Sequence, residues 1–196
     1  MTGGRRLSQA ISEGDGISVI ACVSDAAAAR AAEEQGAEAV ALLGHAEGVR
    51  EATVLPVLYR VDAEPDGAAR AGADACLLVV EEHDGEGQLE ELHDRAVALG
   101  LEIVADVHDE ETLVVALERI DPEIFLLSPR AADDDEEHLE RVLDLLPDVP
   151  AGKLAIADLH VTTRDEVLTL ERAGIDAVLV GSADVAHLVG GAPPEV

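Results

Sequence analysis

Aromatic side chains are almost absent from this sequence of 196 residues: Tyr59 and Phe125 are the only ones, and there is no tryptophan. This chain therefore lacks the aromatic side chains on which a protein stacks nucleic-acid bases or sugar rings. Hydrophobic residues still make up 48% of the sequence, mostly as alanine, valine and leucine. The composition predicts a folded domain with an aliphatic core rather than a disordered chain.

Basic residues are also scarce. Thirteen lysines and arginines face 42 acidic residues, the formal net charge is −29, and Lys153 is the only lysine. A field of that sign repels nucleic acid and anionic membranes, so we expect neither as a partner. It also slows an anionic substrate unless salt screens the charge. The pattern is typical of a halophilic, acidic surface adapted to high ionic strength.

Cysteine is limited to Cys22 and Cys76, and both lie in strand-like apolar runs. This usage predicts buried free thiols in a reducing compartment rather than a disulfide framework. No apolar run precedes residue 17, and no stretch of about 18 apolar residues occurs. We therefore expect a cytoplasmic protein without a signal peptide or a membrane span.

Short apolar runs alternate with helical patterns along the whole chain. The runs are 17–23, 37–43, 53–60, 75–81, 101–107, 123–128, 153–158 and 176–181, and the helices are expected near 25–35, 64–71, 85–99, 109–119, 134–146 and 162–173. This alternation predicts parallel βαβ units. Eight units close naturally into a (β/α)8 TIM barrel, here a minimal α/β barrel with short loops.

We expect a single domain over residues 1–196, with an N-terminal segment at 1–16 and the barrel at 17–188. A helix end, a glycine, an acidic residue and a strand recur at 31–43, 67–80 and 169–181. Gly36, Gly72, Gly100 and Gly174 stand where a helix must end in a left-handed cap before the next strand. An open doubly wound sheet is the alternative, but no glycine-rich dinucleotide fingerprint follows the first strand.

Three stretches carry a resemblance to a known family. They are "LGLEIVADVHDEETLVVAL" (99–117), "VTTRDEVLTLERAGIDAVLVGS" (161–182) and "LPVLYR…ARAGADACLLVV" (55–80). In order and spacing the chain resembles indole-3-glycerol phosphate synthase, over about residues 17–188. That resemblance implies a TIM-barrel lyase of tryptophan biosynthesis. Its reaction closes a ring in a phosphorylated ribulose-anthranilate, with loss of carbon dioxide and water and without a cofactor.

The family's reaction implies a lysine on the third strand as general acid and carboxylates on the first and fifth strands. It also implies an asparagine on the sixth strand and backbone amides after the last two strands, which hold the phosphate. Most of these positions are replaced here. The replaced positions carry Cys22 and Ser24 on the first strand, Gly44-His45 after the second, Arg60 on the third, Asp106 on the fifth, Ser128 on the sixth and Asp158-Leu159-His160 on the seventh. Arg130 after the sixth strand and Gly181-Ser182 on the eighth match the family pattern.

These replacements have chemical consequences. An arginine stays protonated, so Arg60 can stabilise an anion but cannot donate a proton. Asp106 is one methylene shorter than glutamate, and a displacement of about 1 Å can cost roughly 100-fold in rate. Leu159 and His160 replace the small residues that let a phosphate approach the backbone. We therefore expect native synthase activity to be weak or lost.

The candidate catalytic residues are Arg60 and Asp106. The candidate residues for binding a small phosphorylated substrate are Ser128, Arg130, Asp158, Gly181 and Ser182. Three of these residues also have a purely structural interpretation. Asp106 and Arg60 would form a structural ion pair in the barrel mouth, and Ser182 would simply cap a helix.

No metal site is expected. His45, His83, His108 and His160 follow different strands, and their spacing is that of separate loop residues rather than of zinc ligands. The acidic run at 133–137 is interpreted as a solvated helix start. Cys22 would be nucleophilic only if Arg60 lowered its pKa, and a buried structural cysteine is the commoner case.

Three functions are compatible with these residues. The first is a member of the synthase family that retains or once had that activity. The second is a noncatalytic binding or partner protein, and the third is a phosphate-binding barrel enzyme with another small substrate. An oligomer or a protein partner is also possible, because a short barrel bottom would expose apolar surface.

Overall fold

The structure is a computed structural model that describes residues 6–14, 16–61, 64–83, 85, 87–130, 135–181 and 185–189. The strands are β1 (Ser18–Cys22), β2 (Ala39–Leu42), β3 (Val57–Arg60), β4 (Ala75–Val79), β5 (Glu102–Val107), β6 (Ile124–Leu127), β7 (Leu154–Asp158) and β8 (Ala177–Gly181). They pair in parallel, in chain order, and β8 closes on β1. The predicted (β/α)8 barrel is confirmed, and each strand lies within its predicted run.

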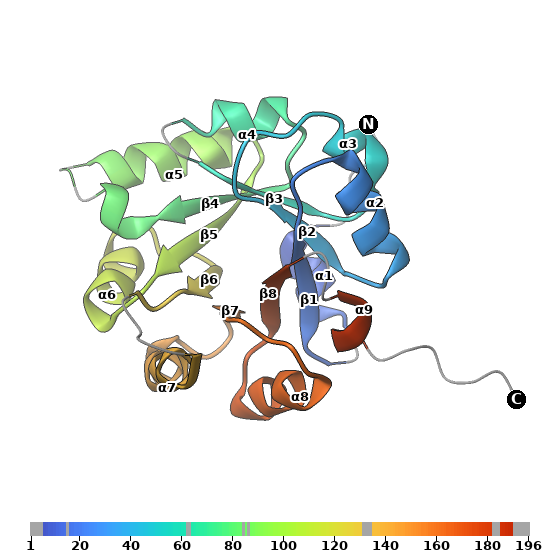
Figure 1. Ribbon diagram of the computed structural model, residues 1–196. Coiled ribbons are helices and arrows are strands. Elements are labelled where there is room, and N and C mark those ends of the chain that lie inside the picture. The colour runs from blue at the N-terminus through green and yellow to red at the C-terminus, as the bar shows by residue number, and fades with distance from the viewer. Residues whose placement is uncertain are drawn as a thin grey trace, which may run out of the picture.

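Helices surround the barrel (Figure 1). They are α1 (Leu7–Ser12), α2 (Ala26–Glu34), α3 (Val49–Ala52), α4 (Asp66–Arg70), α5 (Gln88–Ala98), α6 (Glu110–Arg119), α7 (Asp135–Leu145), α8 (Arg164–Ala173) and α9 (Val185–Leu188), with short 3-10 turns η1 (Val80–His83) and η2 (Leu146–Asp148). Among the described residues, no helix has both the length and the apolar character needed to cross a bilayer. The predicted glycine stops are confirmed: at the end of α8, for example, Gly174 has φ 104°, a value that side chains disfavour.

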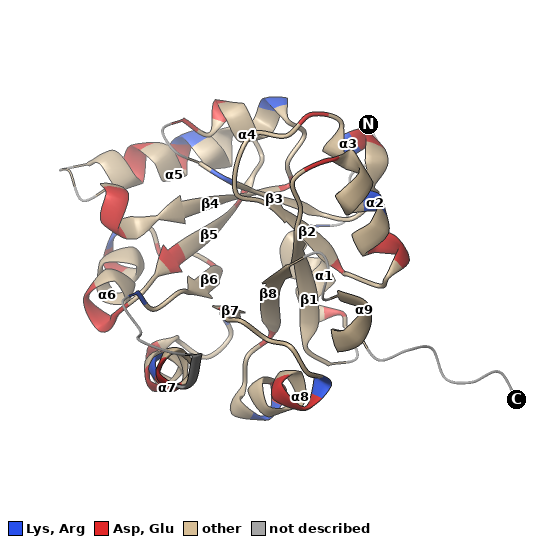
Figure 2. Cartoon of the chain, viewed as in Figure 1, with Lys and Arg blue, Asp and Glu red and all other residues tan. Residues whose placement is uncertain are grey.

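The core has two concentric layers. The outer layer packs the strands against the helices, and the inner layer fills the barrel with aliphatic side chains. Along β5, Val104 belongs to the inner layer, whereas Ile103 and Ala105 belong to the outer layer. Because side chains alternate along a strand, the next inward position on β5 is Asp106. Figure 2 shows the result: acidic residues cover the outer helices and loops, the strands are mostly uncharged, and an acidic position stands out on β5.

Helix α1 closes the end of the barrel opposite the strand C-termini. Leu7 and Ile11 pack into the inner layer, and Leu7 and Ala10 have no exposed surface. The Ser8 hydroxyl and backbone N–H both donate to Glu102, the first residue of β5. The expectation of an exposed apolar bottom is therefore wrong for the described residues, because part of the N-terminal segment covers that bottom.

Candidate functional site

The barrel mouth is lined by the last inward position of each strand. Five strands have a residue of the inner core layer two positions before their last residue: Ile20, Leu58, Val104, Ile156 and Leu179. Because side chains alternate along a strand, the last residues of these strands also face inward. These are Cys22, Arg60, Asp106, Asp158 and Gly181, which surround one opening, and Ser128 follows directly after β6. The structure thus brings together the described candidate residues on the strands, and Ser182 lies outside the described residues.

Asp106 is buried near the centre of this mouth. Its carboxylate accepts a hydrogen bond from the Ser128 hydroxyl, so the two candidates act on each other. Burial raises the pKa of the Asp106 carboxyl above its ordinary value. The Ser128 hydrogen bond and the charges of Arg130, His108 and Arg60 act in the opposite direction without cancelling that rise. Asp106 therefore holds a proton more readily than a surface aspartate does.

Asp158 brings a second, partly buried carboxyl to the same mouth. Burial raises its pKa, the negative charge of Asp106 raises it further, and His138 on α7 partly opposes both effects. Two like charges in one low-dielectric site disfavour double ionisation. The mouth therefore contains a coupled pair of carboxyls suited to holding a proton.

The arginines at the mouth are paired with glutamates that follow β4. Arg60 Nη2 lies 2.8 Å from Glu82 Oε1, and Arg130 Nη1 lies 2.7 Å from Glu81 Oε2. Within the part of the chain that the structure describes, the ion pair expected between Arg60 and Asp106 does not form. Arg60 acts on Asp106 only through its longer-range charge, because the longer Glu82 side chain reaches the guanidinium from the neighbouring loop.

His108 joins the same group of charges. Its Nε2 lies 3.3 Å from Glu81 Oε2, the oxygen that also contacts Arg130. Its backbone N–H donates to the Thr112 hydroxyl, whereas the N-cap of α6 is Asp109. Glu81 thus links the ends of β4, β5 and β6, and Arg130 and His108 are turned toward this carboxylate.

Cys22 is not an activated thiol. Burial, followed by the negative charge of Asp158, raises its pKa to about 12. The idea that Arg60 lowers this pKa is therefore wrong. A thiol that stays protonated at working pH is a poor nucleophile, so Cys22 fills space at the mouth.

The four loop histidines do not converge. His45 is exposed and lies near Glu47, His83 is buried beside Gln88, and His160 is exposed after β7. Across the described ranges there is no group of three or more histidine, cysteine or acidic side chains that could hold a metal ion. His45, His83 and His108 thus have separate local contacts.

The only lysine lies at the opposite end of the barrel. Lys153 comes just before β7, and its ammonium group lies 2.7 Å from Asp121 Oδ1 and 2.8 Å from the carbonyl oxygen of Pro122. These two residues precede β6, at the end that faces away from the mouth. No lysine can therefore act as a general acid at the strand C-termini.

Three residues of the site were not found by sequence reasoning. Glu81 and Glu82 were assigned to the end of a strand and its border, but they lie in η1 and turn toward the two arginines. His138 follows an acidic run and had no pattern that would have distinguished it. The contacts of these three residues depend on tertiary structure, so no local pattern in the sequence shows them.

Comparison with known proteins decides the ancestry. The family model described as "Indole-3-glycerol phosphate synthase" matches residues 62–187. The chain is 32% identical to the indole-3-glycerol phosphate synthase of Geobacillus sp. (strain WCH70) in an alignment 171 residues long, which covers 80% of this chain and 66% of that relative. This chain belongs to the indole-3-glycerol phosphate synthase family. It spans just under two thirds of the length of that relative, so the activity of the whole enzyme does not transfer by similarity alone.

Other relatives agree with this family. The synthase of Variovorax paradoxus (strain S110) is 37% identical over 133 residues, or 66% of this chain and 49% of that protein. Among solved structures, the N-acetylmannosamine-6-phosphate 2-epimerase of Clostridium perfringens superposes with a TM-score of 0.69 at 18% identity, covering 86% of this chain and 87% of the epimerase. At that identity the likeness shows the barrel fold alone.

The carboxyl pair gives a prediction about pH. Replacing Asp158→Asn should raise the melting temperature at pH 7, because it removes a buried charge that Asp106 disfavours. Because the pKa of Asp158 is raised above 3.8 in the folded protein, this side chain does not lower the folded protein's stability below pH 3.8. Stability is lost as the pH rises through the pKa that Asp158 has in the folded protein. The gain should therefore shrink toward zero as pH falls below about 4.

Thermal melts between pH 3 and pH 8 check this expectation. Asp144→Asn, at an exposed position of α7, makes the same charge change away from the mouth and serves as the control. Equal shifts in both variants would show that net charge, rather than the buried pair, sets the effect.

Proposed function

We propose that this family member has weak or no synthase activity and that its barrel mouth serves another role. The observation that carries the proposal is the position of Lys153, the only lysine, at the far end of the barrel. The resemblance assigns the general acid to a lysine on the third strand, where this chain has Arg60. A positioned general acid typically contributes about 10²–10⁴-fold to a rate.

The remaining mouth residues support the same conclusion. Asp106 occupies the place of a family glutamate, but its shorter carboxylate is engaged by Ser128. Cys22 and Ser24 replace the expected acid and lysine on the first strand. Arg60 is held by Glu82, so even its charge is partly neutralised. The positions that would protonate and orient the substrate are thus changed together, whereas Arg130 and Gly181-Ser182 keep the residues that the resemblance implies.

Growth complementation tests this proposal in a cell. We expect the gene to fail to rescue a tryptophan auxotroph that lacks its synthase, while the synthase gene of Geobacillus sp. (strain WCH70) rescues it. Immunoblotting must show that both proteins accumulate, since an unfolded protein would give the same failure. Rescue by this chain would overturn the proposal.

A second candidate function is binding of a small phosphorylated ligand. The supporting observation is Gly181, which is exposed at the end of β8 beside Cys22 in the register. Without a side chain, its backbone allows close approach of an anion. Arg130 would be the natural cation for that ligand, but Glu81 already contacts it.

Phosphate binding should therefore depend on Glu81. In Glu81→Gln we expect inorganic phosphate to raise the melting temperature by about 2–4 °C, roughly 1 kcal/mol for a chain of this size. The native protein should show a much smaller rise, because its arginine is occupied. Differential scanning fluorimetry at matched ionic strength, with Glu51→Gln on α3 as control, measures this. An equal response of all three proteins would rule out Glu81 as the competing group.

We further propose that the protein works in a reducing, salt-rich cytoplasm. Two features support this. Cys22 and Cys76 are free thiols, and burial raises the pKa of Cys76 to about 12, which keeps it unreactive. The formal charge of −29 needs screening counterions to limit self-repulsion of the folded chain.

A further inference from the structure

The barrel mouth holds more negative than positive charge once its ion pairs are counted. Arg60 and Arg130 each contact a glutamate of η1, at 2.8 and 2.7 Å. Asp106 and Asp158 face inward, and in the described part of the chain no arginine pairs with either of them. We propose that this mouth binds a small primary ammonium ion that carries a short alkyl chain. The inference rests on the proposed loss of the synthase role, which leaves the mouth free of the family's phosphorylated substrate.

The two carboxyls of the mouth have oxygens that can still accept hydrogen bonds. Asp106 is 7% exposed, and the Ser128 hydroxyl donates to its Oδ1. Among the described residues, no hydrogen bond or ion pair reaches Asp106 Oδ2 or either oxygen of Asp158. None of these three oxygens is sealed off from solvent, so a ligand in the mouth can reach them. An acceptor with little access to water favours a ligand that supplies donors, and an ammonium group supplies three.

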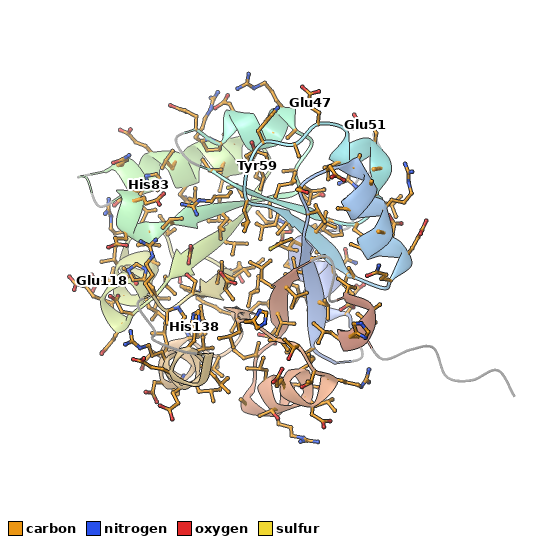
Figure 3. All side chains as sticks on the ribbon, in the orientation of Figure 1. Glu47, Glu51, Tyr59, His83, Glu118 and His138 are labelled. Carbon is orange, nitrogen blue, oxygen red and sulfur yellow. The ribbon has the colours of Figure 1, made fainter. Side chains whose placement is uncertain are left out.

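The positive groups around the mouth do not neutralise this carboxyl pair. Glu81 Oε2 contacts both Arg130 Nη1 and His108 Nε2, so these two groups are turned to a third carboxylate. His138 lies on the side of α7 that faces the ends of β6 and β7 (Figure 3), and it opposes the rise in the pKa of Asp158 only in part. A cation between the carboxyls would favour their ionised form, and the same coupling stabilises the bound cation.

A mainly apolar pocket opens beside the carboxyl pair, at the ends of β1 and β2. Its volume is about 300 Å³, and its lining consists of Cys22, Val23, Ser24, Leu43, Gly44 and His45. Leu43 is 49% exposed, so an alkyl chain that covers it removes apolar surface from water. The polar side chains of the lining, Ser24 and His45, are exposed and remain in contact with water. The pocket therefore suits the uncharged end of an alkylammonium ion.

Strand β8 leaves space between this pocket and the carboxyls. It lies between β7 and β1 in the barrel, and its last residue, Gly181, is aligned with Cys22. Gly181 has no side chain that would separate Cys22 from Asp158, whose charge acts on the thiol. One ligand can therefore place its ammonium group at the carboxyls and its alkyl chain against Leu43.

The ions n-butylammonium and methylammonium and the neutral n-butanol are matched probes. Butylammonium and butanol have nearly the same shape, and only the first is charged. In methyl NMR titrations at pH 7, butylammonium should saturably shift the signals of Val23, Leu43 and Leu179, which stands beside Asp158 in the register. We expect it to bind at least about tenfold more tightly than butanol, as is typical of a charge-assisted hydrogen bond. The butyl chain should improve binding about fivefold over methylammonium.

A constant, high ionic strength and three variants make the test specific. The salt screens the general attraction of cations to the net charge of −29. Asp158→Asn keeps the shape of the side chain and should lower the affinity for butylammonium about tenfold, while butanol binding stays unchanged. Asp144→Asn removes the same charge at an exposed position of α7 and should leave both affinities unchanged. In Leu43→Ser, butylammonium should bind no more tightly than methylammonium.

Several results would overturn the proposal. These are the absence of saturable shifts, equal affinity of butylammonium and butanol, an equal loss in Asp158→Asn and Asp144→Asn, and a butyl preference that survives in Leu43→Ser. Tighter binding of inorganic phosphate than of butylammonium would also overturn it. The comparison of probes in the native protein needs no variant, so it decides the matter even if a variant fails to fold, which circular dichroism detects.

The synthase role is tested separately, by the rate of indole-3-glycerol phosphate formation. An inactive protein that does not bind butylammonium would refute the ammonium site alone and leave the proposed loss of activity intact. An active synthase would refute that proposed loss, whatever the titrations show.

Discussion

Replacing Leu7→Ala should lower the free energy of unfolding by about 2–5 kcal/mol, the usual cost of emptying a fully buried leucine site. Leu7 has no exposed surface and packs into the inner layer of the barrel from α1. The loss combines the transfer free energy of the removed atoms with the cavity that a closed barrel cannot collapse. Denaturant unfolding, followed by circular dichroism, measures it.

Val54→Ala is the matched control for this prediction. Val54 is 78% exposed in the loop before β3, so its truncation should change the unfolding free energy by no more than about 0.5 kcal/mol. If Leu7→Ala were as mild as the control, α1 would not close the barrel in solution. The surface beneath it would then be available to a partner or a second copy.

Most of the fold could be predicted from the sequence because short-range sequence patterns determine its strands and helices. Apolar runs of strand length, glycines at helix ends and acidic first turns each follow from short-range physical chemistry. Residues 7–12 were not predicted as a helix, because six residues give too few turns for a periodic pattern. Their helix depends on contacts of Leu7 and Ile11 with the barrel interior, which are tertiary.

The site was predicted as a set of positions but not as a set of contacts. The family pattern placed Asp106 and Asp158 at the ends of their strands, and the structure shows that both follow inward-facing residues of β5 and β7. The ion pairs that Arg60 and Arg130 form could not be predicted from the family pattern. They depend on η1, a short turn whose glutamates reach across to the neighbouring strands.

The replaced mouth residues are the reason why we propose that ancestry and activity separate in this chain. The barrel keeps its register, so a carboxylate still stands on β5. Where the resemblance implies a proton-donating lysine, this chain has Arg60, which is paired with Glu82. The ammonium group of Lys153, the only lysine, lies near Asp121 at the other end of the barrel. A single reversion, Arg60→Lys, is therefore not expected to restore synthesis, because Cys22 and Ser24 would still lack the chemistry of the family's acid and lysine.

The proposed loss of synthase activity is tested by the rate at which the purified protein forms indole-3-glycerol phosphate at high salt. We expect a turnover about 10²–10⁴-fold below that of the Geobacillus sp. (strain WCH70) synthase assayed beside it, the loss expected for an absent general acid. Arg60→Lys should remain equally slow. A native turnover of about 1–10 s⁻¹, within the ordinary range of enzymes, would show that this chain is an active synthase.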